Sequence, residues 1–293
     1  MDPTLAGFLG LGLFLVLIFI GMPIAFSAAL VGLGGLWVLS GSAPALMSAG
    51  TLPYSITSHY VYTVLPLFII MGHLAYYAGV TQDIFWAGRQ WVGRLPGGLA
   101  SATCIAGAGF GATCGSSIAA AAIFAKVALP ELEKYKYDTK LATGCVAAVG
   151  TLAATIPPSA LIVIYGIMTE QSIGKLLIAG FIPGFLTAAM YILMITLRAW
   201  HNPSLGPPIY GVTWKDRFVS LKGVWGVVIL AGIVTGGLYG GIFTPTEAGA
   251  AGAVGALLIG VALRRLKRHD LWEALLETGR TTGMVFIIIV GIL

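Results

Sequence analysis

Apolar segments long enough to cross a membrane follow one another along this chain, and this pattern constrains its fold more than any other feature. A transmembrane helix needs about 20 largely apolar residues. Such segments cover 4–20, 23–40, 57–78, 141–166, 175–198, 223–241 and 244–263, and an eighth starts near Thr281. With 58% of residues apolar and 9% charged, a water-soluble fold would lack a polar shell. We therefore expect an all-α membrane protein.

A further apolar stretch, 98–127, either crosses the membrane once or turns back on itself. Basic residues lie on both sides of it, at Arg89 and Arg94 and again within 126–140. Basic loops remain cytoplasmic, so a single crossing would place these two loops on opposite faces of the membrane. The charge pattern therefore predicts a re-entrant hairpin, cytoplasmic basic loops and a periplasmic N-terminus in a multi-pass protein.

Two shorter segments, 80–95 and 265–280, combine tryptophan with arginine or lysine and are too polar to span. We expect both to lie along the cytoplasmic interface. A carboxylate at Glu247 interrupts an apolar segment, but Thr244 and Pro245 precede it in the order of a capping box. We therefore predict that Glu247 caps a helix.

Two pairs of short matches suggest an internal duplication. Gly21-Met22-Pro23 resembles 241–245, and 67–70 resembles 285–288, in each case within a similar order of segments. The odd number of spans between the two starts predicts an inverted repeat, as in many secondary transporters. The second repeat is incomplete, so we expect a fragment of a protein of roughly 400 residues.

The expected organisation follows from these segments. It comprises scaffold helices of the first repeat (1–78), an interfacial amphipathic helix (79–97), the hairpin and broken helix of a transport domain (98–171), a linking helix and cytoplasmic loop (172–221), and the start of the second repeat (222–293).

A polar, glycine-rich run marks the middle of the predicted hairpin. Gly107, Gly111 and Gly115 recur every four residues, which by itself equally indicates close helix packing. Ser116 and Ser117 follow at the expected tip, deep in the membrane. A turn there leaves backbone groups unpaired, which is tolerated only against protein, water or a ligand.

A second break is predicted in the segment 141–166, where Pro157 and Pro158 remove two amide donors. A simple proline kink is the alternative interpretation. If the two breaks meet, neutral oxygens would suit a hard cation such as Na⁺. The candidate sodium ligands are the backbone oxygens of Gly150 and Pro157 and the hydroxyls of Ser116, Ser117, Thr151 and Thr155. The neighbouring residues Gly115, Pro158 and Ser159 are predicted to line a substrate path.

The chain contains no phosphate-binding Gly-Lys-Ser/Thr loop, no metal-spaced cluster of histidine and cysteine, and no carboxylate pair within its apolar segments. We therefore expect no enzyme activity, and transport energy supplied by an ion gradient or a partner.

Along essentially its whole length the sequence resembles the large membrane subunit of tripartite ATP-independent periplasmic (TRAP) transporters. The most specific matches are Gly241-Ile242-Phe243-Thr244-Pro245-Thr246-Glu247-Ala248, Ile156-Pro157-Pro158-Ser159, Ser116-Ser117, Pro130-Glu131-Leu132 ahead of Tyr137-Asp138, and Gly180-Phe181-Ile182-Pro183-Gly184.

This resemblance implies an elevator-type, sodium-driven importer of organic acids, such as a C4-dicarboxylate or sialic acid, in a bacterial inner membrane. It implies a small membrane subunit and a periplasmic substrate-binding protein as partners. It also implies that one sodium lies between the first hairpin and the first broken helix, where Ser116, Ser117, Gly150, Thr155 and Pro157 match. A sodium/dicarboxylate symporter that needs no binding protein, and a membrane scaffold without transport activity, are the alternatives.

Overall fold

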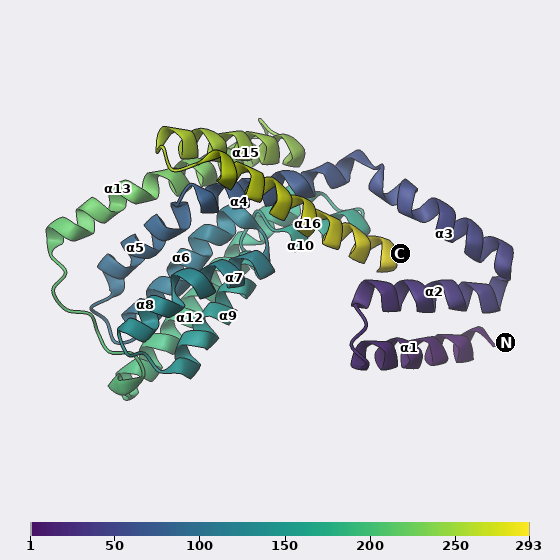
Figure 1. The fold of residues 1–293 in the computed structure, drawn as a ribbon, viewed down its shortest axis with the longest axis horizontal. Helices are drawn as coiled ribbons and strands as arrows, with labels where there is room; N and C mark the ends of the chain where they lie inside the picture. The colour runs from purple at the N-terminus through teal and green to yellow at the C-terminus, as the bar shows by residue number, and fades with distance from the viewer. Residues whose placement is uncertain (1, 293) are drawn as a thin grey trace. The chain divides into compact units, whose positions relative to one another are not determined.

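The structure, a computed structural model, describes residues 2–292 and contains only helices and connecting segments within that range (Figure 1). The chain divides into two compact units. One comprises Met1–Thr63 with Gly279–Leu293, and the other comprises Val64–Thr278. The predicted all-α fold is confirmed.

Several helical stretches have the length and composition of membrane spans. Five qualify among the described residues, and a sixth if the bent pair formed by 139–155 and 160–168 is counted as one span. The five are Tyr60–Tyr77, Ile173–His201, Trp214–Tyr239, Pro245–Ala262 and Arg268–Gly291. Large apolar side chains such as Phe185, Leu193 and Leu197 are exposed, as expected for a surface that faces lipid.

The first unit contains three helices from the N-terminal part of the chain. They are α1 (Pro3–Phe19), α2 (Ile24–Ser40) and α3 (Ser42–Thr57), followed by the 3₁₀ turn η1 (Tyr60–Thr63). Helix α2 packs beside both α1 and α3 (Figure 1).

Residues 41–56 lie between two of the apolar segments read from the sequence and were not expected to be helical, but in the structure α3 occupies them. Two prolines and a glycine concealed the helix. Pro44 falls in the first turn, where no amide donor is needed, and Pro53 is accommodated inside the helix.

The second unit contains most of the remaining helices of the chain. They are α4 (Val64–Tyr77), α5 (Val80–Val92), α6 (Gly98–Cys114), α7 (Ser117–Val127), α8 (Leu129–Lys134), α9 (Thr139–Thr155), α10 (Ala160–Met168), α11 (Ile173–Ala179), α12 (Phe181–His201), η2 (Pro203–Leu205), α13 (Trp214–Ala231), the π-helical segment η3 (Gly232–Gly236), α14 (Gly237–Tyr239) and α15 (Pro245–Ala262). Helices α6 and α9 lie at its centre, with α5, α7 and α12 packed against them (Figure 1).

The predicted hairpin over 98–127 is confirmed. Helices α6 and α7 are separated by only two residues, and the ring centroids of Phe110 on α6 and Phe124 on α7 lie 6.0 Å apart. One continuous, straight α-helix would separate these residues by about 20 Å at 1.5 Å per residue. The chain therefore folds back on itself at the turn between α6 and α7.

The C-terminal helix differs from the prediction. Residues 265–280 were expected to form a separate interfacial segment, but α16 (Arg268–Ile292) continues without a break through residue 280. Residues 271–277 are mostly leucine, alanine and glutamate, which favour helix, and extending an existing helix is easier than ending it. Near its start, Glu277 lies 3.1 Å from Nδ1 of His73 on α4.

The two turns that the sequence suggests are duplicated, at Gly21-Met22 and Gly241-Ile242, have the same backbone hydrogen bonds. The amides of Gly21 and Met22 donate to carbonyls three and five residues earlier, at 2.9 and 3.0 Å, and the amides of Gly241 and Ile242 do the same at 3.2 and 3.0 Å. Both glycines have positive φ angles, +94° and +64°, which end a helix without the steric cost of a side chain. The helices after the turns have similar lengths, 17 residues in α2 and 18 in α15, but only α15 starts with a capping box, the predicted one of Thr244 and Glu247.

Three connections meet at one end of the second unit. The amide of Ile209 donates to the carbonyl of Gly93 at 2.8 Å, that of Gly97 to Gly206 at 2.9 Å, and that of Asp138 to Leu205 at 3.0 Å. The basic loops on either side of the hairpin therefore lie together, as the charge argument requires. Their cytoplasmic position remains a prediction.

A tyrosine joins the starts of the two central helices at this end. The hydroxyl of Tyr137, just before α9, accepts a hydrogen bond of 3.0 Å from the amide of Leu99 in the first turn of α6. Burial raises the pKa of Tyr137 to about 12, so the hydroxyl remains protonated at neutral pH. This contact satisfies one of the amides that a helix start leaves unpaired.

Replacing Tyr137 with phenylalanine should lower the stability of the full-length protein. The change leaves the buried Leu99 amide without a partner, at a cost of about 1–3 kcal/mol. Tyr210→Phe is the control, because that side chain is exposed. Denaturant unfolding in detergent micelles measures the difference, and equal stability of the two variants would contradict the role of this bond.

Candidate functional site

The tip of the hairpin consists of Gly115 and Ser116. Helix α6 ends there because Gly115 adopts a left-handed conformation with φ +62°. Ser116 is extended, and its Oγ accepts a hydrogen bond of 3.3 Å from the amide of Ala119, so it caps the start of α7. The predicted polar tip is thus built from a glycine stop and a serine cap.

The second break separates α9 from α10 by four residues and bends the helix pair by 42°. Pro157 and Pro158 cannot donate to the carbonyls of Ala153 and Ala154 as a continuous helix requires. The hydroxyl of Ser159 instead donates to the Ala154 carbonyl, and the Ile162 amide donates to this hydroxyl at 3.4 Å. Ser159 therefore replaces the donor that Pro158 lacks and also caps α10.

The two breaks touch each other. The amide of Ala160 at the start of α10 donates to the carbonyl of Gly115 at the hairpin tip, at 3.1 Å. A Cβ atom on Gly115 would lie 2.5 Å from the carbonyl oxygen of Pro158, so only glycine allows this approach. The predicted meeting of the two discontinuities is present in the structure.

The other glycines of the stripe pack against α9. A Cβ on Gly107 would lie 2.6 Å from a methyl carbon of Val149, and one on Gly111 would lie 2.8 Å from the Cα of Ala153. The close-packing interpretation of these glycines is therefore correct. The matched order of contacts also shows that α6 and α9 run side by side in the same direction and end at the same place.

This arrangement brings two helix carboxyl ends and two helix amino ends, which carry opposite partial charges, to one point. The carboxyl ends of α6 and α9 bring unpaired carbonyl oxygens and partial negative charge, which favour a cation. The amino ends of α7 and α10 bring amides and partial positive charge, which favour a carboxylate. No cluster of three or more histidine, cysteine, aspartate or glutamate side chains occurs in the described residues.

The predicted ligand residues do not all face the hairpin. Gly150 on α9 does, since a Cβ there would lie 3.1 Å from the carbonyl oxygen of Ser117. Thr151 is exposed, and its hydroxyl lies 3.0 Å from the hydroxyl of Tyr191 on α12. The hydroxyl of Thr155 donates to the Thr151 carbonyl at 2.5 Å. The structure therefore groups Ser116, Ser117 and Gly150, while the Thr151 hydroxyl is turned toward α12.

Helix α12 supports the second break through two glycines whose role the sequence analysis did not identify. A Cβ on Gly180 would lie 3.0 Å from Cγ of Pro157 and 3.1 Å from the carbonyl oxygen of Thr155. One on Gly184 would lie 2.7 Å from Cγ1 of Ile156. The Gly-Phe-Ile-Pro-Gly motif thus lets α12 approach the backbone at the break. The two glycines of this motif are the feature of the sequence that could have predicted the close approach.

A helical hairpin in contact with a discontinuous helix, among several apolar helices long enough to span a membrane, is an arrangement typical of secondary transporters. The chain belongs to the family described as "Tripartite ATP-independent periplasmic transporter, DctM component", which it matches over residues 11–293.

Curated relatives agree with this assignment. The chain is 34% identical over 258 residues to the C4-dicarboxylate TRAP transporter large permease protein DctM of Pseudomonas aeruginosa, covering 87% of this chain and 60% of the relative. It is 31% identical over 293 residues to the sialic acid TRAP transporter large permease protein SiaM of Vibrio cholerae, covering 100% and 66%. It is also 31% identical to the isethionate TRAP transporter permease protein DctMQ of Oleidesulfovibrio alaskensis, covering 94% and 43%.

The chain therefore spans less than two thirds of the length of these relatives. They are transporter permeases and not enzymes, in agreement with the expectation from the sequence.

Replacing Gly115 with alanine should destabilise the junction of the two breaks. A side chain at φ +62° costs about 1–2 kcal/mol, and the new methyl group would also strike the Pro158 carbonyl. Gly144→Ala on α9 is the control, because nothing lies within 4 Å of a Cβ at that position. Unfolding of the full-length protein in detergent measures both variants, and equal stability would show that the close approach at Gly115 does not matter.

Proposed function

We propose that this chain forms the part of a TRAP large permease that binds one sodium ion between the hairpin tip and the broken helix. The contact between the Gly115 carbonyl and the Ala160 amide carries the proposal, because it brings two helix carboxyl ends and two helix amino ends to one point. The nearby hydroxyls of Ser116 and Ser117 and the backbone of Gly150 and Pro157 supply further oxygens. Thr155 contributes through its hydroxyl, and Thr151 through its carbonyl more readily than its hydroxyl.

The transported substrate is an organic acid, and the amino ends of α7 and α10 receive its carboxylate. Gly115, Pro158 and Ser159 border this path. Ser159 itself is fully buried and its hydroxyl is engaged, so its contribution is to shape the path. The names of relatives supply the candidate substrates: C4-dicarboxylate, sialic acid and isethionate.

The proposed setting is a bacterial inner membrane, with the basic loops cytoplasmic and the N-terminus periplasmic. A small membrane subunit and a periplasmic binding protein complete the transporter, and the hairpin with its broken helix moves as an elevator-type transport domain. Family membership supports these proposals.

Uptake into proteoliposomes tests the function. The full-length protein with its small subunit should import a labelled organic acid only with a sodium gradient and the cognate binding protein. Uptake driven by sodium without the binding protein would instead establish a sodium/dicarboxylate symporter. Uptake that is equal in sodium and potassium would contradict sodium coupling.

Replacing Ser116 or Thr155 with alanine should raise the sodium concentration for half-maximal uptake roughly three- to tenfold, because about 1 kcal/mol of ion binding is lost with one oxygen. Ser116→Thr and Thr155→Ser retain a hydroxyl and should preserve the normal dependence. Thr143→Ala removes an exposed hydroxyl elsewhere on α9 and serves as the control. An unchanged sodium dependence in both alanine variants would exclude these hydroxyls as ligands.

A further inference from the structure

A polar cavity of about 430 Å³ opens at the loop end of the second unit, away from the two breaks. Helix α5, the loop 208–212 and the first turn of α13 form its walls. The side chains that give it chemical character are Trp86, Arg89, Gln90, Tyr135, Tyr210 and Asp216. One cation and one anion therefore line the same cavity, between aromatic rings.

The residues around the cavity are of the kinds found where a span leaves the apolar part of a membrane. Helix α12 exposes large apolar side chains along its length and ends in Arg198, Trp200 and His201, directly before the loop that lines the cavity. Tyr210 and Trp214 are also exposed there. Exposed tryptophan and tyrosine beside basic residues are typical of the membrane interface, where phospholipid headgroups lie.

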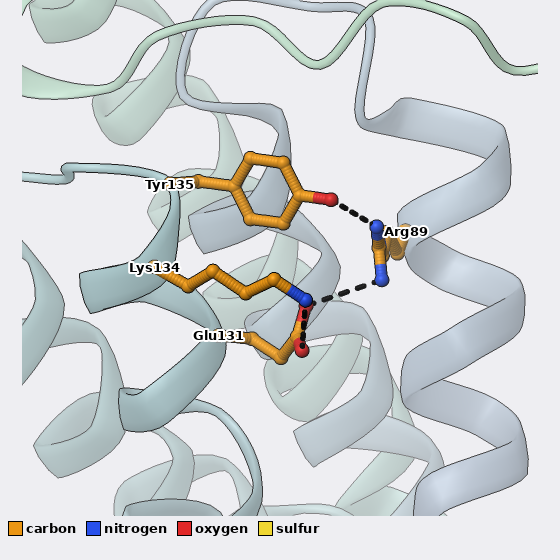
Figure 2. Close-up of polar contacts among 4 residues, drawn as sticks. All are labelled: Arg89, Glu131, Lys134 and Tyr135. Atoms are coloured by element: carbon orange, nitrogen blue, oxygen red, sulfur yellow. Dashed lines mark hydrogen bonds and ion pairs between the residues drawn. The ribbon is translucent and has the colours of Figure 1, made fainter.

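Arg89 makes several contacts in the cavity wall. Figure 2 shows its guanidinium between Glu131 and Tyr135, with Nη1 3.1 Å from a Glu131 oxygen and Nη2 bonded to the Tyr135 hydroxyl. The rings of Trp86 and Tyr135 lie 5.1 and 5.0 Å from its central carbon. Glu131 has a second partner, Lys134, at 3.6 Å.

The guanidinium still has donors to offer. Its Nη1 and Nη2 each carry two N–H groups and use one of them, toward Glu131 and Tyr135, and the side chain remains 16% exposed. Arginine carries five N–H donors in a planar fork that matches phosphate oxygens. A phosphate group that enters the cavity would therefore accept from the N–H groups of Nη1 and Nη2 that Glu131 and Tyr135 leave free.

Asp216 supplies the opposite charge. Its carboxylate closes the α13 capping box through Oδ2, which accepts from the amide and hydroxyl of Thr213 at 3.0 and 2.6 Å. The side chain is exposed and lines the cavity, and within the described residues both of these hydrogen bonds go to Oδ2 and not to Oδ1. A purely anionic headgroup would be repelled by this carboxylate, whereas a primary ammonium would be attracted to it.

We propose that this cavity binds the headgroup of a zwitterionic phospholipid, with its phosphate on Arg89 and its primary ammonium on Asp216. Trp86 and Tyr210 flank the headgroup, and its acyl chains follow the apolar surface into the membrane. Because Arg89 also joins α5 to α8, the bound lipid holds α5 at the interface beside the end of the hairpin.

Native mass spectrometry of the delipidated full-length protein tests the site, with phosphatidylethanolamine, phosphatidylcholine and phosphatidylglycerol of matched acyl chains. Phosphatidylethanolamine should be retained at least fivefold better than the other two.

Arg89→Gln should abolish retention of all three lipids. Glu131 keeps Lys134 as a partner in that variant. Asp216→Asn, which retains an oxygen for the cap, should remove the preference for phosphatidylethanolamine over phosphatidylcholine without reducing phosphatidylcholine binding.

Lys215→Gln removes a positive charge from the same turn of α13 without touching the cavity, and should change nothing. Loss of retention in Lys215→Gln equal to that in Arg89→Gln would overturn the proposal, because it would indicate attraction by general surface charge. Retention of phosphatidylglycerol equal to or above that of phosphatidylethanolamine would also overturn it, as would normal retention in Arg89→Gln.

Discussion

The carbonyl of Gly115 accepts a hydrogen bond from the amide of Ala160, and the arrangement of the second unit depends on this contact between two interrupted helices. Within lipid, each unpaired backbone group costs several kcal/mol. A helix can therefore stop inside a membrane only where protein, water or a ligand takes over its hydrogen bonds. In this chain the hairpin and the broken helix satisfy part of that need for each other, and the carbonyls that remain are the groups that a cation would use.

Small residues make this junction possible. Glycine at 107 and 111 allows α6 to lie against α9, and glycine at 115 allows the hairpin tip to approach Pro158. Glycine at 180 and 184 allows α12 to approach the break from another side. At the opposite end, Tyr137 and the hydrogen bonds between loops hold the starts of α6 and α9 together. Fixed at both ends, the two parallel helices deliver their carboxyl ends to the same point, which is the electrostatic basis of the proposed sodium site.

Features determined by local chemistry could be predicted from the sequence. The double proline ended α9, glycine and serine formed the hairpin tip, and Thr244 and Glu247 formed a capping box, because each effect acts within a few residues. Charge placement also predicted the hairpin. Helix α3 and the continuous α16 were missed, since proline and polar residues weaken a helix signal without determining the outcome. The direction of the Thr151 hydroxyl depends on Tyr191, forty residues later, so the residues next to Thr151 do not predict it.

The central claim is that both breaks contribute to one sodium site, and hydrogen–deuterium exchange of the full-length transporter tests it most directly. Sodium, compared with potassium at equal ionic strength, should slow exchange in peptides covering 111–120 and 152–162 together, with the same concentration dependence. Protection of only one of these segments, or of neither, would contradict a site shared between the hairpin tip and the broken helix.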